Sequence, residues 1–278
     1  MLSIVQSLIQ TALDEDIGSG DITTDNLIDP MREGEGVIIA KEPLVLAGVD
    51  VARQVFHRLD PSIVFEPLAE DGAAIDVRQT IIKVRGKFAD LLKGERTALN
   101  FLQRLSGIAT HVRAYVQLAG DTSAQIVDTR KTTPGWRVLE KYAVRIGGAR
   151  NHRMGLYDGV LIKDNHIAAF GGVKRSIAHV RSKVSHLIKI EVEVTNMEEV
   201  KEAVEAGAEI IMLDNMDEEQ IRTAVAFIDK RAVVEVSGGI TKSNLKQMID
   251  TGVDIISVGA LTHSYPSADL SLLLDETP

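Results

Sequence analysis

Apolar residues recur along the second half of the chain in short runs that alternate with helical patterns. Six runs rich in β-branched residues predict strands, and amphipathic helices separate the last four of them. Near-continuous apolar strands that alternate with helices are typical of a parallel sheet with helices outside it. The predicted strands are Gln125–Asp128, Gly159–Ile162, Leu187–Val194, Glu209–Leu213, Ala232–Val236 and Asp254–Val258.

The helices between these strands have recognisable ends. One is predicted from Thr195, whose spacing to Glu198 fits a capping box, to a terminating Gly207. Another is predicted from Thr241 to Gly252. The stretch Gly207-Ala-Glu-Ile-Ile-Met-Leu has the same pattern as Gly252-Val-Asp-Ile-Ile-Ser-Val, so the chain contains an internal repeat of a helix-ending glycine and a buried strand.

The pattern before about Gly94 is mixed and indicates an α+β unit. A short N-terminal helix ends near Gly18, a second helix covers Asp50–Leu59, and a long helix is predicted to begin near Gly94. Short β-type runs, broken by Pro, Gly and Asp, lie between these helices. They are Val37–Ala40, Ile63–Phe65 and Thr80–Phe88.

Polar residues follow the predicted strands of the second half. A ring of polar strand ends is typical of the carboxyl-terminal face of a (β/α) barrel, whereas a doubly wound sheet concentrates its site at one switch point. A full barrel has eight strands, so the six predicted here indicate a short or incomplete barrel. The alternative is a set of unrelated polar loops. The polar strand ends are Arg130, Lys163, Glu193, Asp214 and Ser237.

Composition excludes several classes of protein. The chain has 278 residues, 45% hydrophobic and 26% charged, which is ordinary for a globular protein. Its net charge of −9 argues against broad nucleic-acid binding. It contains no cysteine, which excludes disulfides, cysteine-ligated metals and thiol catalysis. No apolar stretch is long enough for a membrane span, and the acidic Asp14–Asp16 segment is unlike a signal peptide, so we expect a cytoplasmic protein without a membrane partner.

Basic residues gather between Arg130 and Arg153, although the chain is acidic overall. This segment carries seven lysines and arginines against a single glutamate. A solvated helix face over Val138–Ile146 would account for Arg137 and Lys141. It does not account for the turn-rich loop that follows the first predicted strand and carries two adjacent cations, because such a loop suits binding of a carboxylate or phosphate.

Other polar positions extend this anion site. Lys163 ends a strand, where it would form a Schiff base, bind phosphate, or extend to solvent at the sheet edge. Glu191 and Glu193 lie on one face of a strand, and buried like charges need a cation, a metal or a salt bridge. Glu193 and Asp214 are placed to face a cation or to hold Mg²⁺ through water. Glycine loops after the last two strands, beginning at Ser237 and Ser257, suit phosphate binding.

Longer motifs throughout the chain resemble those of the quinolinate phosphoribosyltransferase family, also called carboxylating nicotinate-nucleotide pyrophosphorylases. The resemblance covers nearly the whole chain, in order. The motifs are Glu15-Asp followed by Gly20-Asp-Ile-Thr-Thr, Asp128-Thr-Arg-Lys-Thr-Thr-Pro-Gly, Lys141-Tyr-Ala-Val-Arg-Ile-Gly-Gly, Asn151-His-Arg-Met-Gly-Leu-Tyr-Asp, Leu161-Ile-Lys-Asp-Asn-His, Glu191-Val-Glu-Val, Ile211-Met-Leu-Asp-Asn, Glu235-Val-Ser-Gly-Gly-Ile and Ser257-Val-Gly-Ala-Leu-Thr-His-Ser.

The resemblance implies a fold, a reaction and an assembly. The fold is of the α/β class, an incomplete (β/α) barrel over residues 95–264 with an N-terminal α+β domain over residues 1–94, which the tail from about residue 265 to 278 rejoins. The reaction converts quinolinate and phosphoribosyl pyrophosphate to nicotinate mononucleotide, pyrophosphate and CO₂, with Mg²⁺. The assembly is a homodimer or a larger homo-oligomer, in which Arg96 of one subunit reaches the partner's site.

The resemblance also implies a role for each residue of the site. The dicarboxylate would be held by Arg96, Arg130, His152, Arg153 and Lys163. The phosphates would be contacted by Lys131, Ser237, Gly238, Gly239 and Gly259. The catalytic residues would be Lys131, Glu193 and Asp214, of which the two acids would stabilise the ribosyl cation and hold Mg²⁺ through water.

Three alternatives remain open from sequence. The first is a paralogue of the same fold, either a nicotinate phosphoribosyltransferase or a molybdenum-transport-associated protein. The second is a Schiff-base aldolase that uses Lys163. The third is a non-catalytic anion-binding module. The full set of arginine and histidine residues favours the dicarboxylate substrate, because a mono-acid has less need of a second carboxylate clamp.

Overall fold

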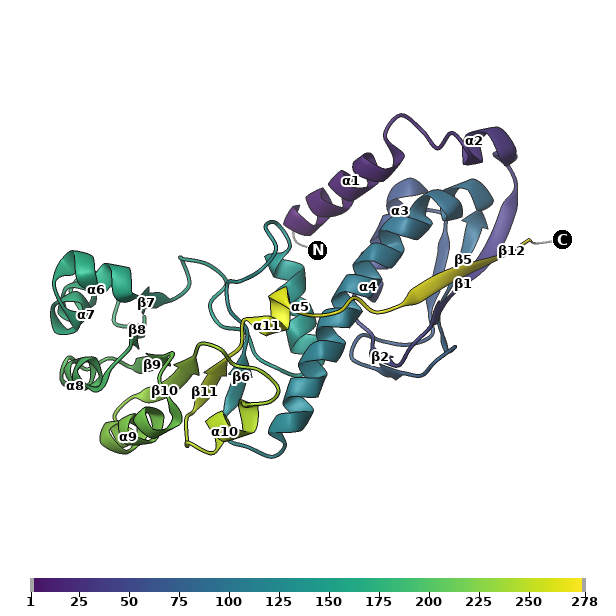
Figure 1. The fold of residues 1–278 in the computed structure, drawn as a ribbon. Coiled ribbons are helices and arrows are strands. Elements are labelled where there is room, and N and C mark those ends of the chain that lie inside the picture. The colour runs from purple at the N-terminus through teal and green to yellow at the C-terminus, as the bar shows by residue number, and fades with distance from the viewer. Residues whose placement is uncertain (1–2, 277–278) are drawn as a thin grey trace. The chain divides into compact units, whose positions relative to one another are not determined.

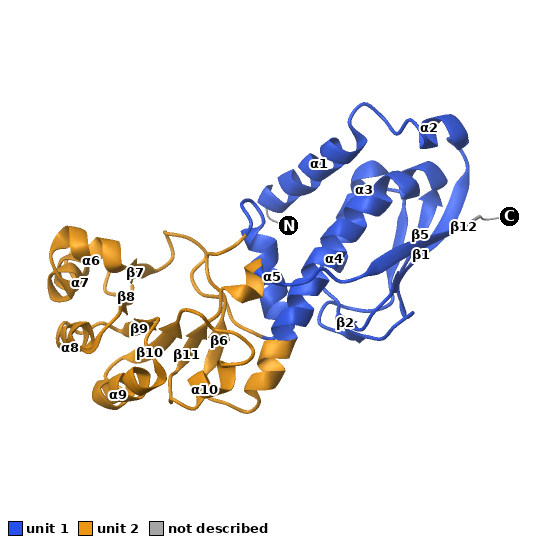
Figure 2. Ribbon diagram, viewed as in Figure 1, with its two compact units in different colours: residues 1–113, 133–148, 264–278 blue, residues 114–132, 149–263 orange. Residues whose placement is uncertain are grey.

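A computed structural model describes residues 3–276 and divides the chain into two compact units, coloured separately in Figure 2. Unit 1 comprises Met1–Arg113, Thr133–Gly148 and Ser264–Pro278, and unit 2 comprises Ala114–Thr132 and Ala149–His263. The domain boundary predicted between residues 94 and 95 falls inside a long helix, α4 (Phe88–Ala119), and stays a prediction.

Unit 1 is built on an antiparallel sheet of four strands in the order β12-β1-β5-β3 (Figure 1). Every second residue of β1 is buried, as expected for a strand with one face on the core. The strands of unit 1 are β1 (Glu33–Ala40), β2 (Leu44–Val45), β3 (Val64–Pro67), β4 (Ala74–Ile75), β5 (Thr80–Lys87) and β12 (Leu270–Glu276). Its helices are α1 (Ser3–Ile17), α2 (Thr24–Leu27), α3 (Val49–Leu59), the first part of α4, and α5 (Arg137–Gly147).

The long helix α4 begins earlier than its sequence pattern predicts. Strand β5 ends at Lys87 and the helix starts at Phe88, so the prediction of a start near Gly94 is wrong. Gly94 lies inside the helix for a packing reason, since a Cβ there would lie 2.8 Å from Cδ1 of Phe56 on α3. A glycine in a helical pattern therefore need not mark a helix end, because it can instead make room for a neighbouring side chain.

Unit 2 contains the predicted parallel sheet. Its six strands lie in the order β6-β11-β10-β9-β8-β7, and all pairs are parallel. The edge strands β6 and β7 are not neighbours in this order, so the predicted incomplete barrel is confirmed. The strands are β6 (Gln125–Val127), β7 (Val160–Ile162), β8 (Ile190–Val194), β9 (Ile210–Asp214), β10 (Val233–Ser237) and β11 (Ile255–Ser257).

Helices connect these strands, as predicted, but two of their starts differ from the prediction. The helix after β8 is capped by Asn196, which accepts a hydrogen bond from the backbone N–H of Glu199, so the predicted capping box at Thr195 is wrong. The helix predicted from Thr241 begins only after Asn244, because that side chain turns back to accept the N–H of Thr241. The helices of this unit are α6 (Asp164–Phe170), α7 (Val173–Arg181), α8 (Met197–Glu205), α9 (Glu218–Ile228), α10 (Leu245–Ile249) and α11 (Ala260–His263).

Burial of the parallel strands fixes where polar side chains can lie. The middle residues of the strands are almost inaccessible, for example Val192, Ile211 and Val236. The chain reaches the surface mainly where each strand ends. No helix among residues 3–276 is both long and apolar enough to cross a membrane.

Candidate functional site

The carboxyl ends of the parallel strands carry the polar residues that the sequence singled out. Lys163 follows β7, Glu193 lies near the end of β8, and the ends of β9 and β10 place Asp214 in register with Ser237. The ammonium of Lys163 forms an ion pair with the carboxylate of Glu193. An amine held in an ion pair is a poor nucleophile, and this pairing argues against a Schiff-base role for Lys163.

A cavity of about 640 Å³ in unit 2 brings three predicted anion-binding residues together. Arg130, Arg153 and Lys163 all line it. Much of the remaining wall is apolar, contributed by β7 and by the helices that follow it, including Leu161 and Phe170. Three cations on an apolar wall suit a flat ligand with several negative groups.

The Arg153 side chain is partly buried. Its guanidinium donates a hydrogen bond to the carbonyl oxygen of Gly159 at 3.1 Å. Burial lowers the pKa of Arg153, and the neighbouring Arg130 lowers it further, whereas Glu191 opposes both effects. Two guanidinium groups that repel each other in one cavity are stabilised by a shared anion, so this pair is suited to a carboxylate or phosphate.

Lys131 is anchored against the loop that follows the last strand of the sheet. The buried hydroxyl of Thr262 donates to the carbonyl oxygen of Lys131 at 2.8 Å. A Cβ on Gly259 would lie 3.0 Å from Cδ of the lysine, so the side chain passes directly over this glycine. The structure therefore brings together two residues that the sequence assigned to phosphate contacts.

The other glycine loop combines a close contact with open space. Gly238 has φ +96°, and a Cβ there would lie 2.2 Å from Oδ1 of Asn215. Gly239 has φ +60°, but a Cβ there would meet no atom within 4 Å. Only Gly238 is needed for internal packing, and the backbone at Gly239 is open for a ligand to approach.

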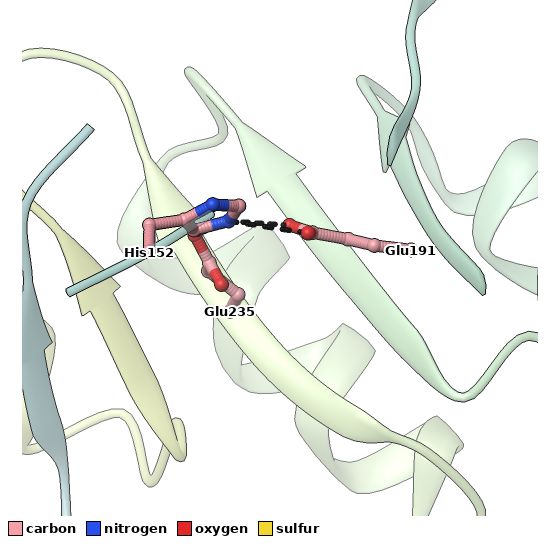
Figure 3. Close-up of side chains that lie close together, drawn as sticks. All are labelled: His152, Glu191 and Glu235. Atoms are coloured by element: carbon pink, nitrogen blue, oxygen red, sulfur yellow. Dashed lines mark hydrogen bonds and ion pairs between the residues drawn. The ribbon is translucent and has the colours of Figure 1, made fainter. Parts of the chain in front are cut away.

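A buried cluster lies beside the cavity, shown in Figure 3: the imidazole of His152 with the carboxylates of Glu191 on β8 and Glu235 on β10. Nε2 of His152 lies 3.1 Å from Glu191 and 3.6 Å from Glu235. The hydroxyl of Ser257 donates a hydrogen bond to Glu235. Burial raises the pKa of Glu235 to about 7, and the charge of Glu191 adds to this, while His152 and Ser257 act in the opposite direction.

The backbone that carries His152 is held by a buried aspartate. Asp128 is fully buried at the end of β6. Its carboxylate accepts the backbone N–H of His152 at 2.8 Å and the side-chain amide of Asn151 at 2.6 Å. Arg150 also forms an isolated parallel bridge with Val127 of β6. The segment that leads to His152 is therefore paired with the edge of the sheet.

Two predicted residues lie in unit 1. Arg96 is exposed on α4, and its predicted role in a partner's site stays a prediction. Lys141 was predicted to lie on a solvated helix face, and this prediction is wrong: Lys141 is fully buried on α5. The neighbouring Glu140 is equally buried and pairs with Arg104 of α4, which shows that α5 turns this side inward.

Sequence reasoning missed the roles of Glu235 and Asp128. Glu235 lies two residues before the glycine loop that begins at Ser237, and Asp128 lies two residues before Arg130. Roles were predicted for Ser237 and Arg130 but none for these two acids. A signal was available: a carboxylate inside an otherwise apolar strand must be paired, just as for Glu191. Pairing with His152 could not be read from spacing, because three separate segments supply the groups.

The acids at the ends of β8 and β9 are suited to a divalent cation. Asp214 accepts a hydrogen bond from the side chain of Asn215 at 2.8 Å and is partly exposed, and Glu193 lies on the adjacent strand. Carboxylate oxygens are ligands that Mg²⁺ prefers, with water and substrate oxygens completing its shell. The carboxylate of Glu193 already pairs with Lys163, so the two acids would suit this ion through water.

Comparison with known families covers almost the whole chain. The quinolinate phosphoribosyl transferase C-terminal domain family matches residues 108–273, and the N-terminal domain family matches residues 21–106.

Individual relatives are similar over nearly all of this chain and most of their own length. A probable carboxylating nicotinate-nucleotide pyrophosphorylase of Synechocystis is 45% identical over 272 residues, which cover 97% of this chain and 92% of the relative. A mitochondrial decarboxylating quinolinate phosphoribosyltransferase of Nicotiana glauca is 39% identical over 98% of this chain and 82% of its own. The crystal structure of NadC from Streptococcus pyogenes matches with a TM-score of 0.95 and 40% identity, covering 99% of this chain and 97% of that one.

Proposed function

The chain belongs to the quinolinate phosphoribosyltransferase family, and we propose that it transfers the phosphoribosyl group of phosphoribosyl pyrophosphate to quinolinate with loss of CO₂. The products are nicotinate mononucleotide and pyrophosphate, so the enzyme is a pentosyltransferase of NAD biosynthesis. The observation that carries this proposal is the cavity shared by Arg130, Arg153 and Lys163.

Quinolinate matches this cavity in shape and charge. It is a flat pyridine ring with two adjacent carboxylates, and the cavity offers three cations on a largely apolar wall. Arg130 and Arg153 bind the carboxylates with bidentate geometry, and Lys163 adds a point charge. His152 was predicted to join this set, and it adjoins Arg153 in the chain.

Phosphoribosyl pyrophosphate binds along the glycine loops. Lys131 and Gly259 contact one phosphate group, and the open backbone at Gly239 admits another. Glu193 and Asp214 face the ribose between these loops and the cavity. Their charges oppose the positive charge that develops on the ribose when its bond to pyrophosphate breaks.

The reaction needs few protein groups once both substrates are held. The bond between ribose C1 and pyrophosphate oxygen breaks, and the pyridine nitrogen forms a new bond to C1. The resulting pyridinium accepts the electron pair released when the 2-carboxylate leaves as CO₂, and a proton from solvent then replaces the carboxylate. No general base is required for the carbon–carbon cleavage.

Mg²⁺ is the proposed cofactor. Glu193 and Asp214 would hold it through water, and the ion would neutralise charge on the departing pyrophosphate. We further propose a homodimer or larger homo-oligomer in which Arg96 enters the partner's site, and a cytoplasmic location.

An assay with quinolinate, phosphoribosyl pyrophosphate and Mg²⁺ tests the proposal by measuring CO₂ and pyrophosphate together. Equal amounts of both products are expected. Nicotinate in place of quinolinate distinguishes the paralogous mono-acid enzyme, since it would release pyrophosphate without CO₂. The proposal would be overturned if the protein turned over nicotinate but not quinolinate, or if well-folded protein released neither CO₂ nor pyrophosphate.

A further inference from the structure

The hydrogen bonds around His152 determine which of its ring nitrogens carries the proton. Nδ1 lies 2.8 Å from the backbone nitrogen of Arg153, and a backbone N–H can only donate. Nδ1 is therefore the acceptor and carries no proton. The proton of the ring lies on Nε2, which faces Glu191 and Glu235.

The two carboxylates hold the ring from separate strands of the sheet. Glu191 accepts from Nε2 at 3.1 Å, and Glu235 lies 3.6 Å from the same nitrogen. Glu235 is in turn fixed by the hydroxyl of Ser257 on β11. The carboxylate side chains are only 6% and 2% exposed, so the cluster is a rigid support rather than a surface ion pair.

The His152 ring holds the backbone of Arg153, on the side away from the guanidinium group. Nδ1 of His152 fixes the backbone N–H of Arg153, while the guanidinium of Arg153 donates to Gly159 and lines the cavity. Both ring nitrogens of His152 are thus bonded within the protein. A substrate carboxylate needs an N–H donor, and the one N–H of this ring points at the glutamates.

We propose that Glu191 and Glu235 are positioning residues that hold the His152 ring in this tautomer, and that the ring acts on the substrate through the backbone of Arg153. This inference rests on the proposed function, because it assigns Arg153 to quinolinate. It differs from the role predicted for His152, which was a direct contact with the dicarboxylate.

A double-mutant cycle tests whether Glu235 acts through Arg153. Glu235→Gln keeps the shape of the side chain and should weaken equilibrium binding of quinolinate about three- to tenfold in the parent. In an Arg153→Ala background the same substitution should change the dissociation constant less than about twofold, because the guanidinium it positions is gone. Glu209→Gln is the control, since Glu209 pairs with Arg181 and does not line the cavity. Equal effects of Glu235→Gln in both backgrounds, or none in the parent, would overturn the proposal.

Nitrogen NMR of the parent protein tests the tautomer without any change to the cluster. The chain has seven histidines, and loss of one signal pair in His152→Gln assigns this ring. We expect Nε2 protonated and Nδ1 unprotonated, both in the free protein and with quinolinate bound. Protonation of Nδ1 on binding would show that the ring itself serves the substrate.

The two proposals fail in different ways. If the parent neither binds nor turns over quinolinate, the proposed function is wrong. If the parent binds and turns over quinolinate but the cycle is additive, only the positioning role is wrong. If Glu235→Gln does not fold, the NMR measurement on the parent still decides the tautomer.

Discussion

At the scale of single residues, the proposed function assigns different roles to the positive and the negative side chains. The cations Arg130, Arg153 and Lys163 line one cavity, whereas Glu193 and Asp214 stand at the ends of neighbouring strands. A dianionic substrate is bound by cations in its ground state. A ribosyl cation exists only in the transition state, so under the proposed function the acids should affect turnover more than binding.

Arg153→Ala should weaken quinolinate binding by roughly ten- to a hundredfold. The reason is the loss of a charge-assisted hydrogen bond at a partly buried position, worth about 1.5–3 kcal/mol. Equilibrium titration with quinolinate measures the effect. An unchanged dissociation constant in a correctly folded variant would remove Arg153 from the substrate site.

Asp214→Asn should lower kcat by about two orders of magnitude and leave the quinolinate dissociation constant within a few-fold of the parent. The substitution keeps the shape of the side chain and removes its charge. Single-turnover rates and titration are measured on the same preparation. A variant that no longer binds quinolinate, but whose remaining complex reacts at the parent rate, would contradict this division of roles.

The buried Glu235 makes stability depend on pH. Its pKa is raised to about 7 in the folded protein, above the ordinary value of 4.5, so the fold favours the protonated carboxyl. That stabilisation is fully present below about pH 4.5 and is lost as the pH rises through about 7. The Tm of the parent should therefore fall more between pH 5.5 and 8.5 than the Tm of Glu235→Gln. The difference should be about 2–4 °C for each kcal/mol of unfolding free energy that the parent loses over this range. Parallel curves of Tm against pH for the two proteins would show that the pKa of Glu235 is not raised in the folded protein.

At the scale of elements, the strands and their polar ends could be predicted from sequence, and the helix starts and pairings could not. The strands were predictable because buried parallel strands are continuous apolar runs. The start of α4 was predicted wrongly because Gly94 does not mark a helix boundary: it makes room for the ring of Phe56. Lys141 was misassigned because helical spacing shows which residues share a face but not which face a neighbouring helix covers.

The loop after β10 offers a prediction at this scale. Gly238→Ala should lower stability by about 1–3 kcal/mol, because a Cβ would lie 2.2 Å from Asn215 at a positive φ. Gly239→Ala should cost less, about 1–2 kcal/mol, because it meets no atom within 4 Å. Gly239→Ala should instead raise the KM for phosphoribosyl pyrophosphate, since its methyl group enters the space left for a phosphate. Thermal unfolding and steady-state kinetics separate the two effects, and a normal KM in Gly239→Ala would argue that no phosphate approaches there.

At the scale of the whole molecule, the cavity and the proposed catalytic acids all belong to unit 2, whereas Arg96 lies on α4 in unit 1. A site that draws this arginine from a partner subunit is complete only in an oligomer. If Arg96 enters the partner's site as proposed, activity depends on which subunits are combined, and mixed dimers test this directly.

Subunits carrying Arg96→Ala and subunits carrying Lys131→Ala should each be inactive alone and recover activity when combined. In a hybrid dimer, one site has the intact Lys131 of its own chain and the intact Arg96 of the other, so purified heterodimers should reach about half the parent activity. Combining Lys131→Ala with Asp214→Ala subunits is the matched control, because both residues belong to unit 2 and no complete site can form. Differently tagged subunits, purified through both tags, ensure that only heterodimers are assayed. If the Arg96 and Lys131 variants stay as inactive as the control pair, Arg96 serves its own chain or lies outside the site.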